Sequence, residues 1–355
     1  KDVASISLYA LVFFMAVTGN ILVIITLSLN RRMRTVTNCF LLSLAVSDLL
    51  LAVCCMPVSL VGQLLQRFVF GALLCKMIPY LMGKSVSVAA STITMLALSL
   101  ERYSSICHPL KSRAWQTRKH ALKVIGGIWV VSFLLVSPTL FFSNLSNIPI
   151  IKAGKCVVAC RMTFPSQVAN KTWYLFLFVA LFCVPGVVMT VAYSKVCWDI
   201  LNRFKLDSSY RNIADGRLGS SSDYNAGSSN GDGVCVSTPQ NPRVPQVTPS
   251  SVFNSPASRQ EQHERANRAL ARWRAKKRVI QMFMLIVVLY FVCWSPLYVI
   301  NIWRAFDPKR AMSALEGHMH IVHLLSYVST CVNPVVYCFM NKRFRDSFLF
   351  VFICC

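Results

Sequence analysis

The stretch Val279–Ala305 reads VIQMFMLIVVLYFVCWSPLYVINIWRA and holds no charged residue before Arg304. A helix of this length and composition can cross the hydrocarbon core of a bilayer, which is roughly 30 Å thick. Six further apolar runs of the same kind are Ser5–Leu29, Asn38–Leu64, Ala72–Ser105, Ala121–Phe142, Trp173–Leu201 and Met319–Met340. The sequence therefore predicts an all-α protein, a seven-transmembrane helix bundle.

The composition of the chain agrees with a membrane protein. Of its 355 residues, 55% are hydrophobic and 14% are charged, whereas soluble domains carry about 25% charged residues. The formal net charge is +24, but the basic residues lie between the apolar runs rather than on one polar face. This distribution excludes a nucleic-acid-binding protein, which needs a basic surface on a folded soluble domain.

The positions of Lys and Arg predict the orientation of the bundle, because cytoplasmic connections are enriched in both residues. The richest connections follow the first, third, fifth and seventh runs, and their basic residues include Arg31, Arg32, Arg34, Lys111, Arg113, Arg118, Lys119, Arg272, Arg274, Lys276, Lys277, Arg278, Lys342, Arg343 and Arg345. The amino terminus is then extracellular. Two sequons fall on the predicted outer side, so Asn144 and Asn170 are glycosylation candidates.

We divide the chain into four parts: 1–203 with helices one to five, 204–271, 272–341 with helices six and seven, and 342–355. The second part is rich in Ser, Gly, Asn and Pro. It is predicted to be a disordered third cytoplasmic loop, because it has too little apolar surface to form a core. The last part is predicted to be a short amphipathic helix, whose terminal Cys354 and Cys355 are candidates for palmitoylation.

Three cysteines lie on the predicted outer side, where disulfides form. Cys75 begins the third run, and Cys156 and Cys160 lie in the connection between the fourth and fifth runs. A Cys75–Cys160 bridge would hold this connection over the bundle, and Cys156 is the alternative partner of Cys75. The sequence leaves the choice open.

Asp48 and Glu101 are the two carboxylates well within the apolar runs, and an intramembrane charge is costly enough to indicate a function. Asp48 is interpreted as a hydrogen-bond hub with Asn20 and Asn333, as a sodium site together with Ser91, or as both. A second mid-membrane carboxylate beside Asp48 for acid–base chemistry, an HExxH motif and a phosphate-binding glycine loop are missing from the sequence. We therefore expect a protein that is not an enzyme and has no cofactor other than an allosteric sodium ion.

Each predicted helix contains a short motif that is typical of one receptor class. The motifs are Gly19-Asn20, Leu44-Ala45-Val46-Ser47-Asp48, Cys75 with Glu101-Arg102-Tyr103, Trp129, Pro185 with Tyr193, Cys293-Trp294-Ser295-Pro296 and Asn333-Pro334-Val335-Val336-Tyr337. In this order and at these spacings they resemble a rhodopsin-like (class A) G-protein-coupled receptor. The resemblance implies an activation switch formed by Glu101, Arg102, Tyr103, Tyr193, Trp294, Pro296, Asn333, Pro334 and Tyr337. It also implies a plasma-membrane location, with a heterotrimeric G protein, arrestin, receptor kinases and membrane lipid as partners.

Longer stretches resemble the cholecystokinin/gastrin receptors within this class. They are Arg34-Thr35-Val36-Thr37-Asn38, Trp115-Gln116-Thr117, Ala275–Ile280, Trp303–Asp307 and Tyr337–Arg345. The resemblance implies an amidated acidic peptide as ligand and Gq-class signalling through calcium release. A different anionic neuropeptide is the alternative ligand.

The same resemblance implies a set of ligand-binding residues. Arg304 would pair with the aspartate of the peptide, Asn301 with its terminal amide region and Arg161 with a sulfated tyrosine. Arg161 is typical of the cholecystokinin-preferring subtype, whereas His323 is typical of the gastrin-preferring subtype; Tyr327 belongs to the same site. The chemistry of the residues agrees, because guanidinium groups bind carboxylate and sulfate in bidentate fashion.

The third run departs from the family pattern, since Cys75 and Arg102 are two residues further apart. The extra pair is predicted near Ala89-Ala90. Two residues turn a helix by about 200°, so a bulge must absorb them if both ends are to face correctly. Counting from Cys75 predicts Met82 in the ligand site, whereas counting from Arg102 predicts Lys84.

Overall fold

The computed structural model describes residues 2–30, 33, 35–65, 67–82, 86–150, 155–219, 256–314, 319–340 and 344–348. The chain divides into two compact units, one formed by 1–197 with 278–355 and the other by 198–277. Predictions for Lys84, Cys354 and Cys355 lie outside the described residues.

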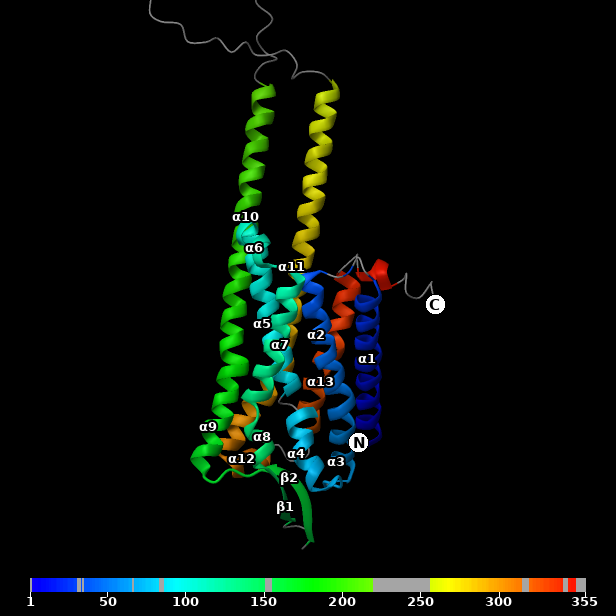
Figure 1. Cartoon of the computed structure of the whole chain (residues 1–355), viewed down its shortest axis with the longest axis vertical. Helices are drawn as coiled ribbons and strands as arrows, with labels where there is room; N and C mark the ends of the chain where they lie inside the picture. Colours follow the sequence, from blue (N-terminus) through cyan, green and yellow to red (C-terminus); the bar gives the residue numbers. More distant parts are fainter. Residues whose placement is uncertain are drawn as a thin grey trace, which may run out of the picture. The chain divides into compact units, whose positions relative to one another are not determined.

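The first half of the bundle consists of α1 (Asp2–Leu29), α2 (Val36–Leu50), η2 (Leu51–Cys55), α3 (Met56–Leu65), α4 (Gly71–Met77), η3 (Ile78–Met82), α5 (Val86–Cys107), α6 (Pro109–Trp115), α7 (Arg118–Leu135) and α8 (Pro138–Phe142). A hairpin of β1 (Ser143–Ile150) and β2 (Lys155–Met162) follows. The second half consists of α9 (Gln167–Phe178), η4 (Val179–Cys183), α10 (Val184–Gly219), α11 (Pro256–Phe306), α12 (Pro308–Ala314) and α13 (Met319–Met340). The η segments are π-helical turns. The all-α prediction is confirmed, with one short hairpin among the described residues (Figure 1).

Six helical segments of the described chain are long and apolar enough to cross a membrane. They are Ala4–Leu29, Val36–Leu65, Arg118–Phe142, Gln167–Asn202, Lys277–Phe306 and Met319–Met340. The remaining predicted span, Ala72–Ser105, is described in two parts, α4 with η3 and then α5, on either side of residues 83–85. The second part of this span, α5, packs against both α2 and α7.

Close approach of α1 and α13 depends on Gly19. A Cβ at this position would lie 3.0 Å from the side chain of Pro334, and α1 packs along α13 in the structure. One turn of α13 therefore occupies the space that any larger side chain of α1 would need.

The π-helical turns all lie beside prolines. Pro57 follows η2, Pro79 lies within η3, and Pro185 follows η4. A proline lacks the amide hydrogen and crowds the carbonyl four residues earlier, and a π turn relieves this by adding one residue to the turn. Among the described residues of the third span, the irregular turn thus lies at Ile78–Met82, and no bulge interrupts the α-helix at Ala89-Ala90.

The outer hairpin lies at the end of the bundle where α1 begins, opposite the end occupied by α6 (Figure 1). Its antiparallel register pairs Leu145 with Cys160. A disulfide joins Cys160 to Cys75 at the start of the third span, so the alternative bridge through Cys156 is not formed. The backbone amide of Phe68 also donates to the carbonyl of Val158 at 2.8 Å. These two links fix β2 over the outer end of the bundle.

Both ends of the segment that we predicted as a disordered loop are helical in the structure. Within the second unit, residues 204–219 are helical as part of α10, and residues 256–271 are helical as part of α11. Pro256 suits the first position of a helix, the residues after it are mainly good helix formers, and Arg268 pairs with Glu264 at 2.7 Å one turn away. The boundaries placed at 203 and 271 therefore fall inside helices, and residues 220–255 lie outside the described residues.

Substitution of Gly19 by Ala is expected to destabilise the bundle, because the added methyl group meets Pro334 at 3.0 Å. Overpacking of this kind costs about 1–3 kcal/mol, so the thermal midpoint of the purified protein should fall by several degrees. Gly126→Ala is the matched control, since a Cβ there meets nothing within 4 Å. Equal midpoints for the two variants would contradict the close contact.

Candidate functional site

A cavity of about 390 Å³ opens beneath the outer hairpin. It is lined by Cys55, Val58, Ser59, Phe68, Ile78, Pro79, Thr139, Cys160, Met162, Tyr174, Leu177, Leu181, Trp294, Leu297, Tyr298, Asn301 and Tyr327. The lining is mainly apolar and aromatic, with a few hydroxyl and amide groups. A cavity of this kind suits an organic ligand that combines apolar side chains with a few polar groups.

Two of the predicted ligand residues, Asn301 and Tyr327, line this cavity. Tyr327 is fully buried, and its hydroxyl is hydrogen-bonded to that of Ser59 at 2.6 Å. Its ring also lies edge-on to Tyr9, with centroids 6.2 Å apart. Tyr327 therefore joins α13 to α3 and α1, in addition to forming part of the cavity wall.

The predicted cations lie near the cavity without lining it. Side chains alternate along a strand, so Arg161 lies on the face of β2 opposite to Cys160 and Met162. Partial burial and the nearby guanidinium of Arg304 lower the pKa of Arg161. Among the described residues, neither guanidinium has a carboxylate partner. Arg304 also lies in the last turn of α11, where a cation is favoured by the helix dipole.

Two other predicted residues are less informative. Met82 belongs to η3, but its side chain is not among those described. His323 lies on α13 and does not line the cavity. The placement of Met82, or alternatively Lys84, in the ligand site therefore remains a prediction.

Trp294 lies where the cavity meets the core of the bundle. Its indole N–H donates to the hydroxyl of Ser329 on α13 at 3.0 Å, and Ser329 in turn donates to the carbonyl of Ser326 at 2.7 Å. The rings of Tyr290 and Tyr298 pack on either side of it, at centroid distances of 5.9 and 6.4 Å. Trp294, a residue of α11 that lines the cavity, is thus joined to α13 through Ser329.

Pro296 and Pro334 each leave one backbone carbonyl without its helical donor. Ser295 donates to the carbonyl of Val292, which Pro296 frees, at 3.4 Å. Asn20 donates from α1 to the carbonyl of Thr330, which Pro334 frees, at 2.9 Å. In a membrane such groups need internal partners, and these contacts supply them.

Asp48 is buried at 4% exposure and joins three helices. Asn333 donates to one carboxylate oxygen at 2.7 Å, and Ser91 donates to the other at 3.3 Å. Of the expected hub partners, Asn333 is therefore bonded to Asp48, and Ser91, predicted as a sodium ligand, is bonded to it as well. Asn20 is not bonded to Asp48, because its amide donates to the carbonyls of Ala16 and Thr330.

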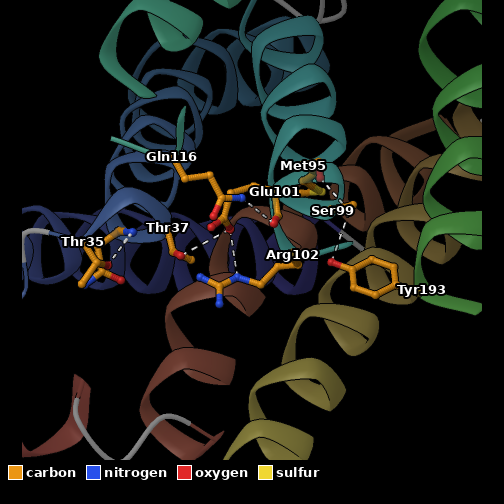
Figure 2. Close-up of polar contacts among 9 residues, drawn as sticks. Thr35, Thr37, Met95, Ser99, Glu101, Arg102, Gln116 and Tyr193 are labelled. Atoms are coloured by element: carbon orange, nitrogen blue, oxygen red, sulfur yellow. Dashed lines mark hydrogen bonds and ion pairs between the residues drawn. The ribbon is translucent and has the colours of Figure 1, made fainter. Parts of the chain in front are cut away.

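Glu101 and Arg102 form the centre of a polar network near the end of α5 (Figure 2). The guanidinium of Arg102 lies 3.0 Å from the carboxylate of Glu101, which also accepts from the hydroxyl of Thr37 at 3.4 Å. Gln116 donates to the backbone carbonyl of Glu101 at 3.1 Å. Arg102 also lies 5.3 Å from the ring centroid of Phe283 on α11. Our sequence reasoning missed Thr37, Gln116 and Phe283 as parts of this network, because no local pattern pairs them with Glu101 or Arg102.

The neighbouring tyrosines pack around this network. The hydroxyls of Tyr193 and Ser99 are hydrogen-bonded at 3.2 Å, which joins α10 to α5 (Figure 2). The ring centroid of Tyr103 lies 5.9 Å from the ammonium nitrogen of Lys195. Tyr337 is buried, and its ring is edge-on to Phe344 with centroids 6.0 Å apart. The predicted switch residues thus lie on the facing sides of α5, α10, α11 and α13.

A family model described as "7 transmembrane receptor (rhodopsin family)" matches residues 19–337. The chain belongs to this family. The receptor is 46% identical to the cholecystokinin receptor type A of Canis lupus familiaris, over 100% of this chain and 82% of the relative. It is 43% identical to the gastrin/cholecystokinin type B receptor of Rattus norvegicus, over 97% and 77%. It is also 42% identical to the cholecystokinin receptor of Xenopus laevis, over 99% and 77%.

Membership of the family decides several of the sequence predictions. The receptor is a multi-pass protein of the plasma membrane with an extracellular amino terminus, and it is not an enzyme. The cavity and the hairpin are therefore on the extracellular side, and the Glu101–Arg102 network is on the cytoplasmic side. Asn144 is exposed on β1, whereas Asn170 lies half-buried in the first turns of α9. Glycosylation at either residue remains a prediction.

Glu101→Gln is expected to raise ligand-independent activity of the receptor severalfold. The neutral amide no longer attracts the charge of Arg102. The lost interaction free energy shifts the equilibrium between the resting and active conformations by the corresponding Boltzmann factor. Basal nucleotide exchange on G proteins, measured at equal surface expression, checks this. Glu264→Gln removes the charge of an exposed ion pair and should leave basal exchange unchanged. An unchanged basal rate in Glu101→Gln would show that the ion pair does not restrain the receptor.

Proposed function

We propose that this receptor recognises amidated acidic peptides of the cholecystokinin/gastrin type and signals mainly through Gq-class G proteins and calcium release. The observation that carries the proposal is the pair of guanidiniums, Arg161 and Arg304, beside a cavity with an apolar lining. The names of the similar receptors support the same ligand class.

The electrostatics favour an anionic ligand. Burial and, after it, the nearby guanidinium of Arg304 lower the pKa of Arg161, and the second cause is a repulsion between the two cations in the ligand-free receptor. A carboxylate or sulfate between them converts this repulsion into attraction and can bind each guanidinium through two hydrogen bonds. A neutral ligand gains neither effect, so charge selects the peptide class.

The lining of the cavity suits the remainder of such a peptide. Tyr174, Leu177 and Leu297 offer apolar and aromatic surface, and the side chain of Asn301 can both donate to and accept from an amide. Anionic groups of the peptide then stay near the two arginines while its amidated end lies deeper. This arrangement assigns the two ends of the ligand to chemically different parts of the site.

Ligand contact in the cavity would act on the cytoplasmic end through α11. Pro296 interrupts the backbone ladder of this helix and makes a natural hinge. A peptide that favours the opened arrangement shifts the population towards it. Arg102 then leaves Glu101, Tyr193 and Tyr337 rearrange, and a G protein enters beside the basic segment Arg272–Arg278. Arrestin and receptor kinases would act on the same opened state.

The ligand class is tested by calcium release in cells that express the receptor, dosed with sulfated cholecystokinin octapeptide, its unsulfated form and gastrin. Arg304→Ala should raise the half-maximal peptide concentration by about 10- to 100-fold, as expected for loss of a buried charge contact. Lys309→Ala is the matched control, because this cation is exposed on α12, and its dose–response curve should not move. Silence towards all three peptides at normal surface expression would overturn the ligand assignment and favour another anionic neuropeptide.

The same experiment compares the subtypes. If Arg161 contacts a sulfate, Arg161→Ala should reduce the potency of the sulfated octapeptide much more than that of its unsulfated form. Equal losses would show that Arg161 acts only through general charge. Removal of the Gq-class α subunits from the cells should abolish calcium release, and a persisting response would contradict the coupling.

We also propose that Asp48 and Ser91 bind an allosteric sodium ion, since an ionised carboxylate and a hydroxyl oxygen are suitable hard ligands. Agonist affinity should be lower in sodium chloride than in the same concentration of choline chloride, and Asp48→Asn should remove the difference. Equal affinities of the unmodified receptor in both salts would argue against the site.

A further inference from the structure

A buried hydrogen bond joins α5 to α11 one turn below Trp294. The hydroxyl groups of Thr92 and Tyr290 form it, and these residues are 0% and 3% exposed. Packing alone does not explain this pair, because Phe and Val would fill nearly the same space. The hydroxyl groups are stabilising only while they are paired, since a buried polar group without a partner is costly.

The proton positions in this pair follow from the number of donors. Each hydroxyl has one O–H, and that of Thr92 donates to the carbonyl of Val88 at 2.8 Å. Tyr290 must therefore donate to Thr92. The oxygen of Tyr290 is then left to accept, and the hydroxyl of Tyr298 is the group that interacts with it from the side of the cavity. The result is a directed bond from Tyr290 through Thr92 to the backbone of α5, with Tyr298 next to it.

Tyr298 also belongs to the ligand site, because it lines the cavity. Thr92 anchors the bonded pair to the backbone of α5. Tyr290 and Tyr298 lie on either side of Pro296, where α11 lacks a backbone hydrogen bond. The three hydroxyl groups therefore lie at the bend of α11 as well as at its contact with α5.

Movement of α11 away from α5 would separate Tyr290 from Thr92. Both groups lie in a low-dielectric interior, where neighbouring hydrogen bonds strengthen one another and unpaired groups are costly. The Tyr290 ring is surrounded by Phe291 and Trp294, at centroid distances of 5.5 and 5.9 Å, and these rings offer no strong acceptor in place of Thr92. The bonded pair therefore favours the closed arrangement.

We propose that Tyr298, Tyr290 and Thr92 form a hydroxyl latch that holds the receptor in its resting conformation, and that a hydrogen-bond acceptor of the bound ligand releases it at Tyr298. Tyr290 and Thr92 are positioning residues, which act on the cytoplasmic end through the position of α11. Tyr298 is the residue at which an activating ligand is distinguished from one that only occupies the cavity. The resting-state role is independent of the proposed peptide, whereas the release step rests on a ligand in the described cavity.

The latch is tested by ligand-independent nucleotide exchange in membranes that contain equal amounts of receptor, with one α subunit from each main G-protein class. Tyr290→Phe and Thr92→Val should each raise basal exchange about fivefold, the population shift that corresponds to one net hydrogen bond. Thr92→Ser keeps the hydroxyl and should restore the low basal rate. The double variant should equal the single ones, because both remove the same bond.

Thr94→Val is the matched control. Thr94 is a buried threonine on the same helix, and its hydroxyl has no partner among the described residues, so its removal should leave basal exchange unchanged. Failure of Tyr290→Phe to raise exchange with any α subunit, or an additive effect in the double variant, would overturn the latch. A rise in Thr94→Val equal to that in Thr92→Val would do the same, since it would show a general packing effect.

Release by the ligand is tested separately. In Tyr298→Phe, the maximal response to a peptide agonist should approach the raised basal rate, so that the ratio of stimulated to basal exchange falls. An unchanged ratio would overturn release at Tyr298. If the three peptides fail but the basal effects of Tyr290→Phe and Thr92→Val appear, the ligand assignment is wrong and the resting latch stands.

Discussion

Every backbone polar group inside a bilayer needs an internal partner, because the hydrocarbon core supplies no water. This constraint decides where the helices of the receptor are joined. Pro334 frees the carbonyl of Thr330, and Asn20 of α1 occupies it. Pro296 frees the carbonyl of Val292, and Ser295 occupies it more weakly at 3.4 Å. The first contact joins α1 to α13. The second contact stays within α11, so it does not attach the hinge at Pro296 to another helix.

The same constraint separates the two ends of the receptor chemically. Within the bundle, the two buried carboxylates are paired across helices, Asp48 with Asn333 and Glu101 with Thr37. At the extracellular mouth, water is present, and Arg161 and Arg304 have no carboxylate partner among the described residues. Paired groups inside hold one conformation of the bundle. The two cations at the extracellular mouth can receive an anion. Ligand binding and restraint of the bundle therefore depend on residues at different depths in the membrane.

The sequence predicted the fold well because its signals are local. Long apolar runs gave the spans, and the Cys75–Cys160 bridge was one of the two options that the cysteine positions allowed. The segment 204–271, predicted as a disordered loop, is helical at both ends, because overall composition hides the helix-forming residues that follow Pro256. In the third span, the count of residues reveals an excess without its location. The described π turn of this span lies at Pro79 within η3, whereas Ala89-Ala90 is regular α-helix.

The sequence by itself determined the number of spans, their orientation and the residue types available for function, since these depend on hydrophobicity and charge along the chain. Tertiary structure decided which polar groups meet, as in Thr92 with Tyr290, Ser59 with Tyr327 and Asn20 with Thr330. The physical reason is that lipid tails are as apolar as the interior of the bundle. The hydrophobic pattern of a span therefore does not reveal which side faces its neighbours, and helix rotation is fixed only when all the helices pack together.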